Sequence, residues 1–195
     1  MSRRKSAASL ARKKIPDDFY DSVEVSQLIN MIMRDGKKQL ATSIVHGGFD
    51  NLYAHYLKEM GGKTTAELIG KDVDQAENSG ESSTKFSDLD KKDAVLRLFD
   101  AVLDKVGPSL ELKSKRVGGA NIQVPIMVQS DRRYTLAMRF IIKNARTRIS
   151  QMKSMSKALS QEMIDVLKGS AKSLDDKEQT LRMAKANAVF QGVRR

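Results

Sequence analysis

The stretch KSKRVGGANIQVPIMV, residues 113–128, decides the fold. Apolar and polar residues alternate in Leu110–Lys113, before Gly118–Gly119, and again in Ile122–Gln129, after it. This pattern is typical of two strands joined by a tight glycine turn. Pro125 has no N–H to give to a ladder, so its strand is expected to keep an open edge. We therefore predict a two-stranded β-hairpin at 109–129 that projects from the chain, and no larger sheet.

Outside this segment, apolar residues recur every three to four positions, as they do on one face of a helix. The pattern predicts helices at 22–34, from the turn at 33–38 through about Tyr56, and at 93–106, 132–149, 155–168 and 174–190. The expected N-caps are Ser22, then Ser130 or Asp131, and the capping-box pair Ser173 and Asp176. Gly36, Gly107 and Gly169 are expected to end helices. The fold class is mainly α, with about six helices and one protruding two-stranded β-hairpin.

The composition points to a polyanionic partner. The 195-residue chain carries a formal net charge of +11, and its 40% hydrophobic residues suffice for a core. Such an excess attracts nucleic acid first and an anionic membrane surface second. The chain has no Cys, which excludes disulfides and thiolate metal sites, and nothing indicates secretion. No apolar run approaches the roughly 20 residues that cross a bilayer.

The charge is unevenly distributed along the chain. Residues 1–18 form a basic N-terminal arm, expected to be disordered until it meets a polyanion. An organelle presequence has a similar composition; the lack of a readable cleavage site favours a mature arm. Residues 58–92 contain eight acids and six bases, so we interpret them as a flexible acidic insertion. Residues 19–57 and 93–193 are then a single helical RNA-binding domain.

The predicted helix at 132–149 carries a basic stripe. Arg132, Arg139, Lys143 and Arg146 are 7, 4 and 3 residues apart, which keeps them on one side of a helix. The stripe contains no acid, whereas a solvated face usually mixes charges, so we favour phosphate binding. Strand pairing could also bring the basic residues of the hairpin stem next to the start of this helix.

No motif supports catalysis, a metal or a cofactor. Gly62-Lys63-Thr64 resembles the end of a phosphate-binding loop but lacks the earlier glycine. Asp88-Leu89-Asp90 resembles a calcium loop without its central glycine. His46 and His55 are poorly spaced for a metal, and no spacing suggests a nucleophile with its base. We expect no enzymatic activity and no cofactor.

Four separated blocks resemble the ribosomal protein S-seven family of the small ribosomal subunit. They are Ile29–Val45, Lys113–Pro125, Tyr134–Ile141 and Arg182–Phe190, in the family's order, and the resemblance covers about 1–57 and 93–193. It implies a helical core with a β-ribbon that binds the 3-prime major domain of small-subunit rRNA. It further implies that the protein nucleates assembly of the subunit head and lies near the tRNA exit site on the intersubunit face.

The resemblance also implies which residues bind. Family members contact rRNA through the arm, the turn after the first helix, the hairpin stem and the fourth helix. Carried over, these are Arg3, Arg4, Lys5, Arg34, Lys37, Lys38, Lys113, Lys115, Arg116, Arg132, Arg133, Arg139, Lys143 and Arg146. The hairpin tip, which comprises Gly118, Gly119, Ala120 and Asn121, is expected near the tRNA exit site.

The implied partners are small-subunit rRNA, tRNA in the exit site and neighbouring head proteins, with no membrane and no small-molecule substrate. The implied location is the small subunit of ribosomes, in the bacterial cytoplasm or in an organelle such as the mitochondrial matrix. Charge and helices alone also fit a helical DNA-binding regulator. Some family members bind their own messenger RNA, which leaves translational repression open as a secondary role.

The chain departs from the family pattern in several places. The segment 58–92 replaces a connection that is usually short. Asp175 and Asp176 stand where the family is often rich in Lys, which puts an rRNA contact there in doubt. Ile122 replaces a commonly aromatic residue near the ribbon tip, and the chain ends in GVRR without the frequent aromatic terminus.

Overall fold

The computed structural model describes residues 14–60, 91–117 and 119–192. In chain order the elements are α2 (Val23–Ile32), α3 (Lys38–Met60), α6 (Lys91–Val106), β1 (Leu110–Val117), β2 (Ala120–Met127), α7 (Ser130–Met152), α8 (Met155–Lys168), α9 (Lys172–Ala186) and the 3-10 helix η3 (Ala188–Gly192). The described residues form six α-helices and one antiparallel hairpin, which confirms the predicted fold class. Residues 1–13 of the arm and 61–90 of the insertion lie outside the described residues, whereas 58–60 and 91–92 are helical.

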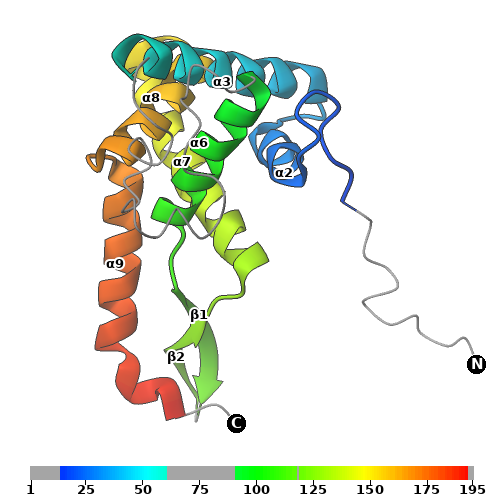
Figure 1. Ribbon diagram of the computed structural model, residues 1–195. Coiled ribbons are helices and arrows are strands. Elements are labelled where there is room, and N and C mark those ends of the chain that lie inside the picture. Colours follow the sequence, from blue (N-terminus) through cyan, green and yellow to red (C-terminus); the bar gives the residue numbers. More distant parts are fainter. Residues whose placement is uncertain (1–13, 61–90, 118, 193–195) are drawn as a thin grey trace, which may run out of the picture.

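The core lies between α3, α6, α7 and α8. Figure 1 shows α3 lying across one end of the other three helices, while α9 runs along their side toward the hairpin. Each helix turns its apolar positions inward, and Phe49, Phe99, Met138 and Leu159 are fully buried where these helices meet. The bundle thereby forms a rigid support for whatever its outer surface binds.

The hairpin has the predicted two-residue turn. Val117 pairs with Ala120, and Gly119 has a φ of 92°, a left-handed conformation that glycine adopts without a Cβ clash. The ladder ends at the pair Leu110 and Met127. α9 contacts β1 and η3 contacts β2. Figure 1 shows η3 beside the far end of the hairpin, whose turn points away from the bundle.

The predicted N-caps agree with the structure in one case. The hydroxyl oxygen of Ser22 accepts the backbone N–H of Val25 at 3.4 Å, which confirms this cap. The prediction of Ser130 or Asp131 for α7 is wrong, because the N-cap is Gln129 and makes no side-chain cap bond. The Asp131 carboxylate instead forms a surface ion pair with an arm residue, Lys14, at 3.2 Å.

The predicted capping box of α9 is also wrong. The helix begins at Lys172 after Ala171, and no side chain of its own caps it. The backbone N–H and the hydroxyl of Ser173 both donate to Oε1 of Glu162, at 3.1 and 2.6 Å. A fully buried carboxylate on α8 therefore satisfies the first turn of α9, a role that sequence spacing could not reveal.

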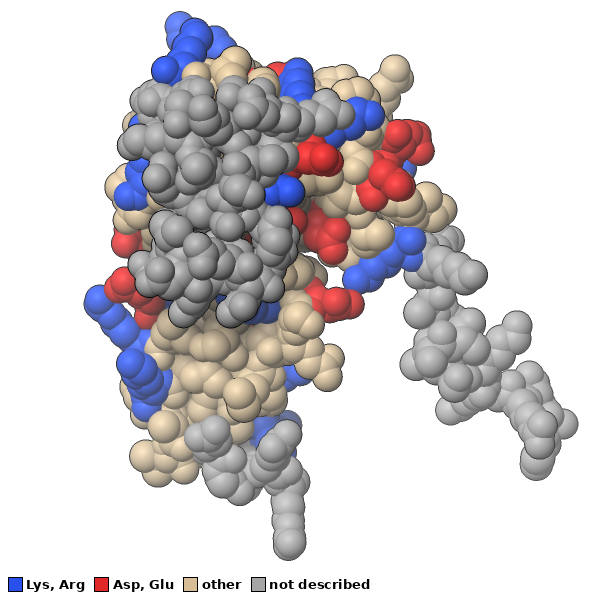
Figure 2. All heavy atoms as spheres, in the orientation of Figure 1, with Lys and Arg blue, Asp and Glu red and all other residues tan. Residues whose placement is uncertain are grey.

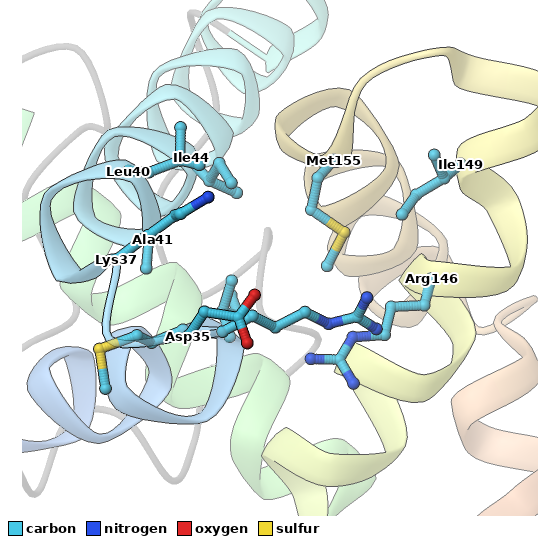
Figure 3. Close-up of a pocket in the computed structure, with 11 residues that line it drawn as sticks. Asp35, Lys37, Leu40, Ala41, Ile44, Arg146, Ile149 and Met155 are labelled. Atoms are coloured by element: carbon cyan, nitrogen blue, oxygen red, sulfur yellow. The ribbon is translucent and has the colours of Figure 1, made fainter.

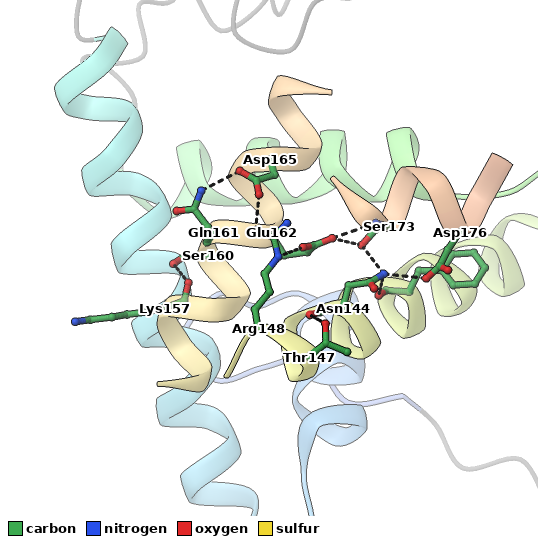
Figure 4. Close-up of polar contacts among 11 residues, drawn as sticks. Asn144, Thr147, Arg148, Lys157, Ser160, Gln161, Glu162, Asp165, Ser173 and Asp176 are labelled. Carbon is green, nitrogen blue, oxygen red and sulfur yellow. Dashed lines mark hydrogen bonds and ion pairs between the residues drawn. The ribbon is translucent and has the colours of Figure 1, made fainter. Parts of the chain in front are cut away.

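A buried polar network fixes the rotation of α7 about its own axis (Figure 4). The Nε of Arg148 lies 2.9 Å from Oε2 of Glu162, and its Nη1 donates to Asp165, also on α8. The amide of Asn144 donates to Oδ2 of Asp176 on α9 at 2.9 Å. At 100° per residue, Arg148 lies opposite Arg139 on the helix, so the network turns the predicted basic stripe outward.

Candidate nucleic-acid interface

The predicted binding residues fall into two groups. In the first group the side chain is already paired with another part of the chain, and in the second it is not. Arg132 donates to both carboxylate oxygens of Glu111 on β1, with Nε 3.1 Å from Oε2. The ammonium of Lys143 donates to Asp176 at 3.1 Å. Two members of the acid-free stripe are thus paired with carboxylates that come from other elements.

Arg133 is also committed to the fold. Its guanidinium donates to the carbonyl of Gly107 at 3.3 Å and to the carbonyl of Asp104 at 2.8 Å, both at the end of α6. These carbonyls have no partner further along the helix, so a cation at this position stabilises the C-terminus of α6. We interpret Arg133 mainly as a residue that joins α6 to α7.

The remaining predicted cations on the bundle and hairpin have side chains without a hydrogen bond or ion pair to any described residue. We call them the unpaired cations: Arg34, Lys37, Lys38, Lys113, Arg116, Arg139 and Arg146. Lys115 is not in this set, because it has an interaction within the chain. Cations left without an internal partner can give their full charge and all their donors to an external phosphate.

The fold brings the turn after α2 and the outer face of α7 together. Arg34 and Lys37 line one side of a pocket of about 540 Å³, and Arg146 lines the other. A second pocket of about 460 Å³ lies where α2 faces the start of α7, and Arg139 lines it. The cations of the turn after α2 and those of α7 therefore form one basic surface, although they are about a hundred residues apart in the sequence.

The hairpin does not join this surface in the expected way. Arg132 is held at Glu111, near the base of the ribbon, whereas Arg116 pairs with Asn121 beside the turn. Five residues of strand separate these positions, a distance of about 16 Å. The expectation that pairing would place the stem cations next to Arg132 is wrong for Arg116, which belongs to the tip.

Sequence reasoning missed several residues that line the two pockets. The amides of Gln27 and Asn30 on α2 contribute to the second pocket, and Asp35 and Leu40 contribute to the first. The dipeptide Asp35–Gly36 carried a signal, since both residues take positive φ, 52° and 72°, in the turn that presents Arg34 and Lys37. The amides gave no signal, because their position depends on how α2 packs against α7.

The ion pair between Glu111 and Arg132 has an electrostatic signature. The hydrogen bond from Arg132 is the main reason that the pKa of Glu111 is lowered, with smaller contributions from the charges of Lys113 and Arg139. The pKa of Arg132 is raised chiefly by the same bond. The pair ties β1 to the first turn of α7 and so sets the direction in which the hairpin leaves the bundle.

The surface is mixed in charge elsewhere. The face shown in Figure 2 has acidic side chains grouped beside α2 and both signs along α9. Within 14–60, 91–117 and 119–192, no three His, Asp or Glu side chains gather as a metal site would require. None of the helices described there is both long and apolar enough to span a membrane.

Arg3, Arg4, Lys5 and Gly118 lie outside the described residues. Gly119, Ala120 and Asn121 are exposed at the end of the hairpin. The half-buried Tyr134 packs against the core.

Comparison with known proteins identifies the family. The sequence model of the family described as Ribosomal protein S7p/S5e matches residues 2–188. The chain belongs to this family. It is 37% identical over 190 residues to a protein of Acidiphilium cryptum named small ribosomal subunit protein uS7, and the match covers 97% of each chain.

Relatives in other bacteria carry the same name. The protein of Coxiella burnetii is 33% identical over 202 residues, with 97% of each chain covered. The protein of Pelotomaculum thermopropionicum is 36% identical over 179 residues, which cover 92% of this chain and 91% of the relative. The S7p/S5e family is one of ribosomal proteins and not of enzymes, which confirms the non-enzymatic interpretation of the sequence.

Proposed function

We propose that this chain is a structural component of the small ribosomal subunit and binds the 3-prime major domain of small-subunit rRNA. The observation that carries the proposal is the surface formed by Arg34, Lys37, Arg139 and Arg146, whose charges the described part of the fold leaves unpaired. Family membership supports rRNA as the polyanion, because the relatives are named as small-subunit proteins.

The binding mechanism divides the basic residues into two roles. The unpaired arginines present planar forks that match two phosphate oxygens, and the unpaired lysines act as point charges. Arg132, Arg133 and Lys143 instead hold β1, α6 and α9 against α7, which keeps the binding residues in a fixed relation before RNA arrives. A preformed surface loses little conformational entropy on binding, which favours an early role in assembly.

We extend the proposal to the position of the protein in the subunit. The chain nucleates assembly of the subunit head, and its hairpin tip, with Arg116 beside Gly119, reaches toward the exit-site tRNA on the intersubunit face. The exposed tip and its distance from the bundle support this assignment (Figure 1). The basic arm with Arg3, Arg4 and Lys5 adds further phosphate contacts, and neighbouring head proteins are the remaining partners.

Binding of the purified full-length chain to a head-domain rRNA fragment tests the proposal. The comparison RNA is a duplex of random sequence and equal length, and a DNA duplex of that length tests the regulator alternative. At about 150 mM salt we expect the fragment to be preferred by at least a hundredfold, since non-specific binding is weakened most by salt. Equal affinity for all three nucleic acids would reject the proposal.

The hairpin requires a separate test. Arg116→Ala should weaken binding to the head-domain fragment or to assembled subunits, whereas the core, which Arg116 does not touch, keeps its stability. A variant that binds like the unmodified chain removes the hairpin from the interface and leaves the bundle surface in place.

A further inference from the structure

One pocket on the basic surface has an apolar interior. Side chains from α3, α7 and α8 line its floor, chiefly Leu40, Ile44, Ile149 and Met155 (Figure 3). Leu40 is 58% exposed and Ile149 is 37% exposed, so the pocket keeps hydrocarbon in contact with water. A phosphate would gain nothing from such a floor, because an anion that loses water there finds no donors.

The rim of the same pocket is charged. Arg34 and Lys37 stand on the α2–α3 turn, and Arg146 reaches toward them from α7. Asp35 also lines the pocket and is negatively charged, unlike Arg34, Lys37 and Arg146. Figure 3 shows its carboxylate turned toward the interior, between the α3 side chains and Arg146. The pocket thus combines cations for phosphate, an apolar floor and one strong hydrogen-bond acceptor.

These three features match one nucleotide unit of RNA. An unstacked base has two apolar faces that gain from burial, its own phosphates lie within reach of a cationic rim, and its edge carries donors. A carboxylate accepts from the amino groups of adenine, cytosine and guanine but repels a phosphate. The volume of about 540 Å³ falls within the range of small-molecule sites, which suits a single nucleoside.

We propose that this pocket captures one unpaired base of the bound RNA, a base that carries an amino group. The apolar floor covers the base, Asp35 accepts from its amino group, and Arg34, Lys37 and Arg146 hold the flanking phosphates. The inference rests on the proposed rRNA binding and adds to it a contact that reads base chemistry, since phosphate contacts alone carry no sequence information.

Chemical probing of the head-domain rRNA fragment with saturating full-length protein tests the pocket. Dimethyl sulfate reports the exposed edges of adenine and cytosine, and kethoxal reports that of guanine. The test variant is Leu40→Gln, which removes apolar floor at an exposed position and changes no charge. Leu57→Gln is the matched control, because Leu57 lies on the same helix, is 43% exposed and does not line the pocket.

We expect one or two unpaired nucleotides to be protected by the unmodified chain and by Leu57→Gln, and to regain reactivity with Leu40→Gln while all other protections persist. The overall affinity for the fragment should fall roughly three- to tenfold with Leu40→Gln, the loss expected for uncovering part of a base. Asp35→Asn should expose the same nucleotides, and Asn tolerates the positive φ at this position.

Different results would overturn the pocket proposal and the proposal of rRNA binding. Protection patterns that are the same with Leu40→Gln and Leu57→Gln overturn the pocket proposal and leave rRNA binding intact, as would occur if another part of this chain or a partner protein filled the pocket. The absence of any protection by the unmodified chain overturns rRNA binding and the pocket together.

Discussion

Replacement of Arg139 by Gln tests whether the unpaired cations are the residues that bind phosphate. Arg139 is exposed on the outer face of α7 and has no hydrogen bond or ion pair with a described residue. Gln keeps much of the side-chain length and a good helix propensity, so the fold should be unaffected. The variant therefore removes one positive charge from the proposed interface and little else.

The size of the effect follows from counterion release. Each phosphate that a cation neutralises contributes about −0.9 to the slope of log affinity against log salt, by a rule derived for duplex DNA. If all the unpaired cations bind one phosphate each, the slope for the bundle and hairpin is about −6. Arg139→Gln should reduce its magnitude by about 0.9, which is about 3.5-fold in affinity between 50 and 200 mM salt.

The matched control is Arg182→Gln on α9. Arg182 is 80% exposed but pairs with Glu178 at 3.1 Å and has Asp175 as a neighbour. Filter binding or fluorescence anisotropy with the head-domain rRNA fragment, at four or more salt concentrations, gives both slopes. We expect no change in slope for the control. Equal changes in the two variants, or no change for Arg139→Gln, would refute the division into paired and unpaired cations.

Three further predictions concern the support of the surface. Arg148→Met leaves the fully buried Glu162 without its cation, so thermal unfolding should show that the free energy of unfolding falls by about 3–5 kcal/mol, or the Tm by about 6–20 °C. A decrease of less than about 1 kcal/mol contradicts a stabilising role for the ion pair between Arg148 and Glu162. Arg132→Gln removes the hydrogen bond that lowers the pKa of Glu111 in the folded chain. This bond stabilises the fold at pH values above 4.5, the ordinary pKa of the carboxyl, and the stabilisation is lost as the pH falls through the lower pKa of the folded chain. The drop in the free energy of unfolding between about pH 6 and about pH 3 should therefore be about 0.5–1 kcal/mol smaller in this variant than in the unmodified chain. An equal drop in both proteins counts against a stabilising ion pair between Arg132 and Glu111. Gly119→Val places a β-branched side chain at a φ of 92°, which destabilises the hairpin by about 1–2 kcal/mol. Hydrogen exchange of the backbone amides should therefore accelerate in 110–127 and not in the core helices. Unchanged exchange in the hairpin would show that the turn does not require glycine at this position.

The sequence was a reliable guide to the elements because their signals are local. Alternation around Gly118–Gly119 predicted the hairpin, and Ser22 was recognised as a cap from its place before an apolar helix. The cap of α9 was mispredicted because Ser173 has a tertiary partner, Glu162 on α8. The cap of α7 was mispredicted because this helix begins at Ser130, before the start that the apolar pattern indicated. A local rule cannot weigh a local bond against a tertiary one.

The sequence by itself determined the helices, the ribbon, the excess of positive charge and the family to which the chain belongs. Only the tertiary structure decided which cations remain available to a ligand. Arg132 and Arg139 look equivalent on one stripe of α7, yet Glu111 on β1 binds the first and no described side chain binds the second. The reason is physical: an ion pair requires two groups within about 4 Å, and only the packing of separate elements sets that distance.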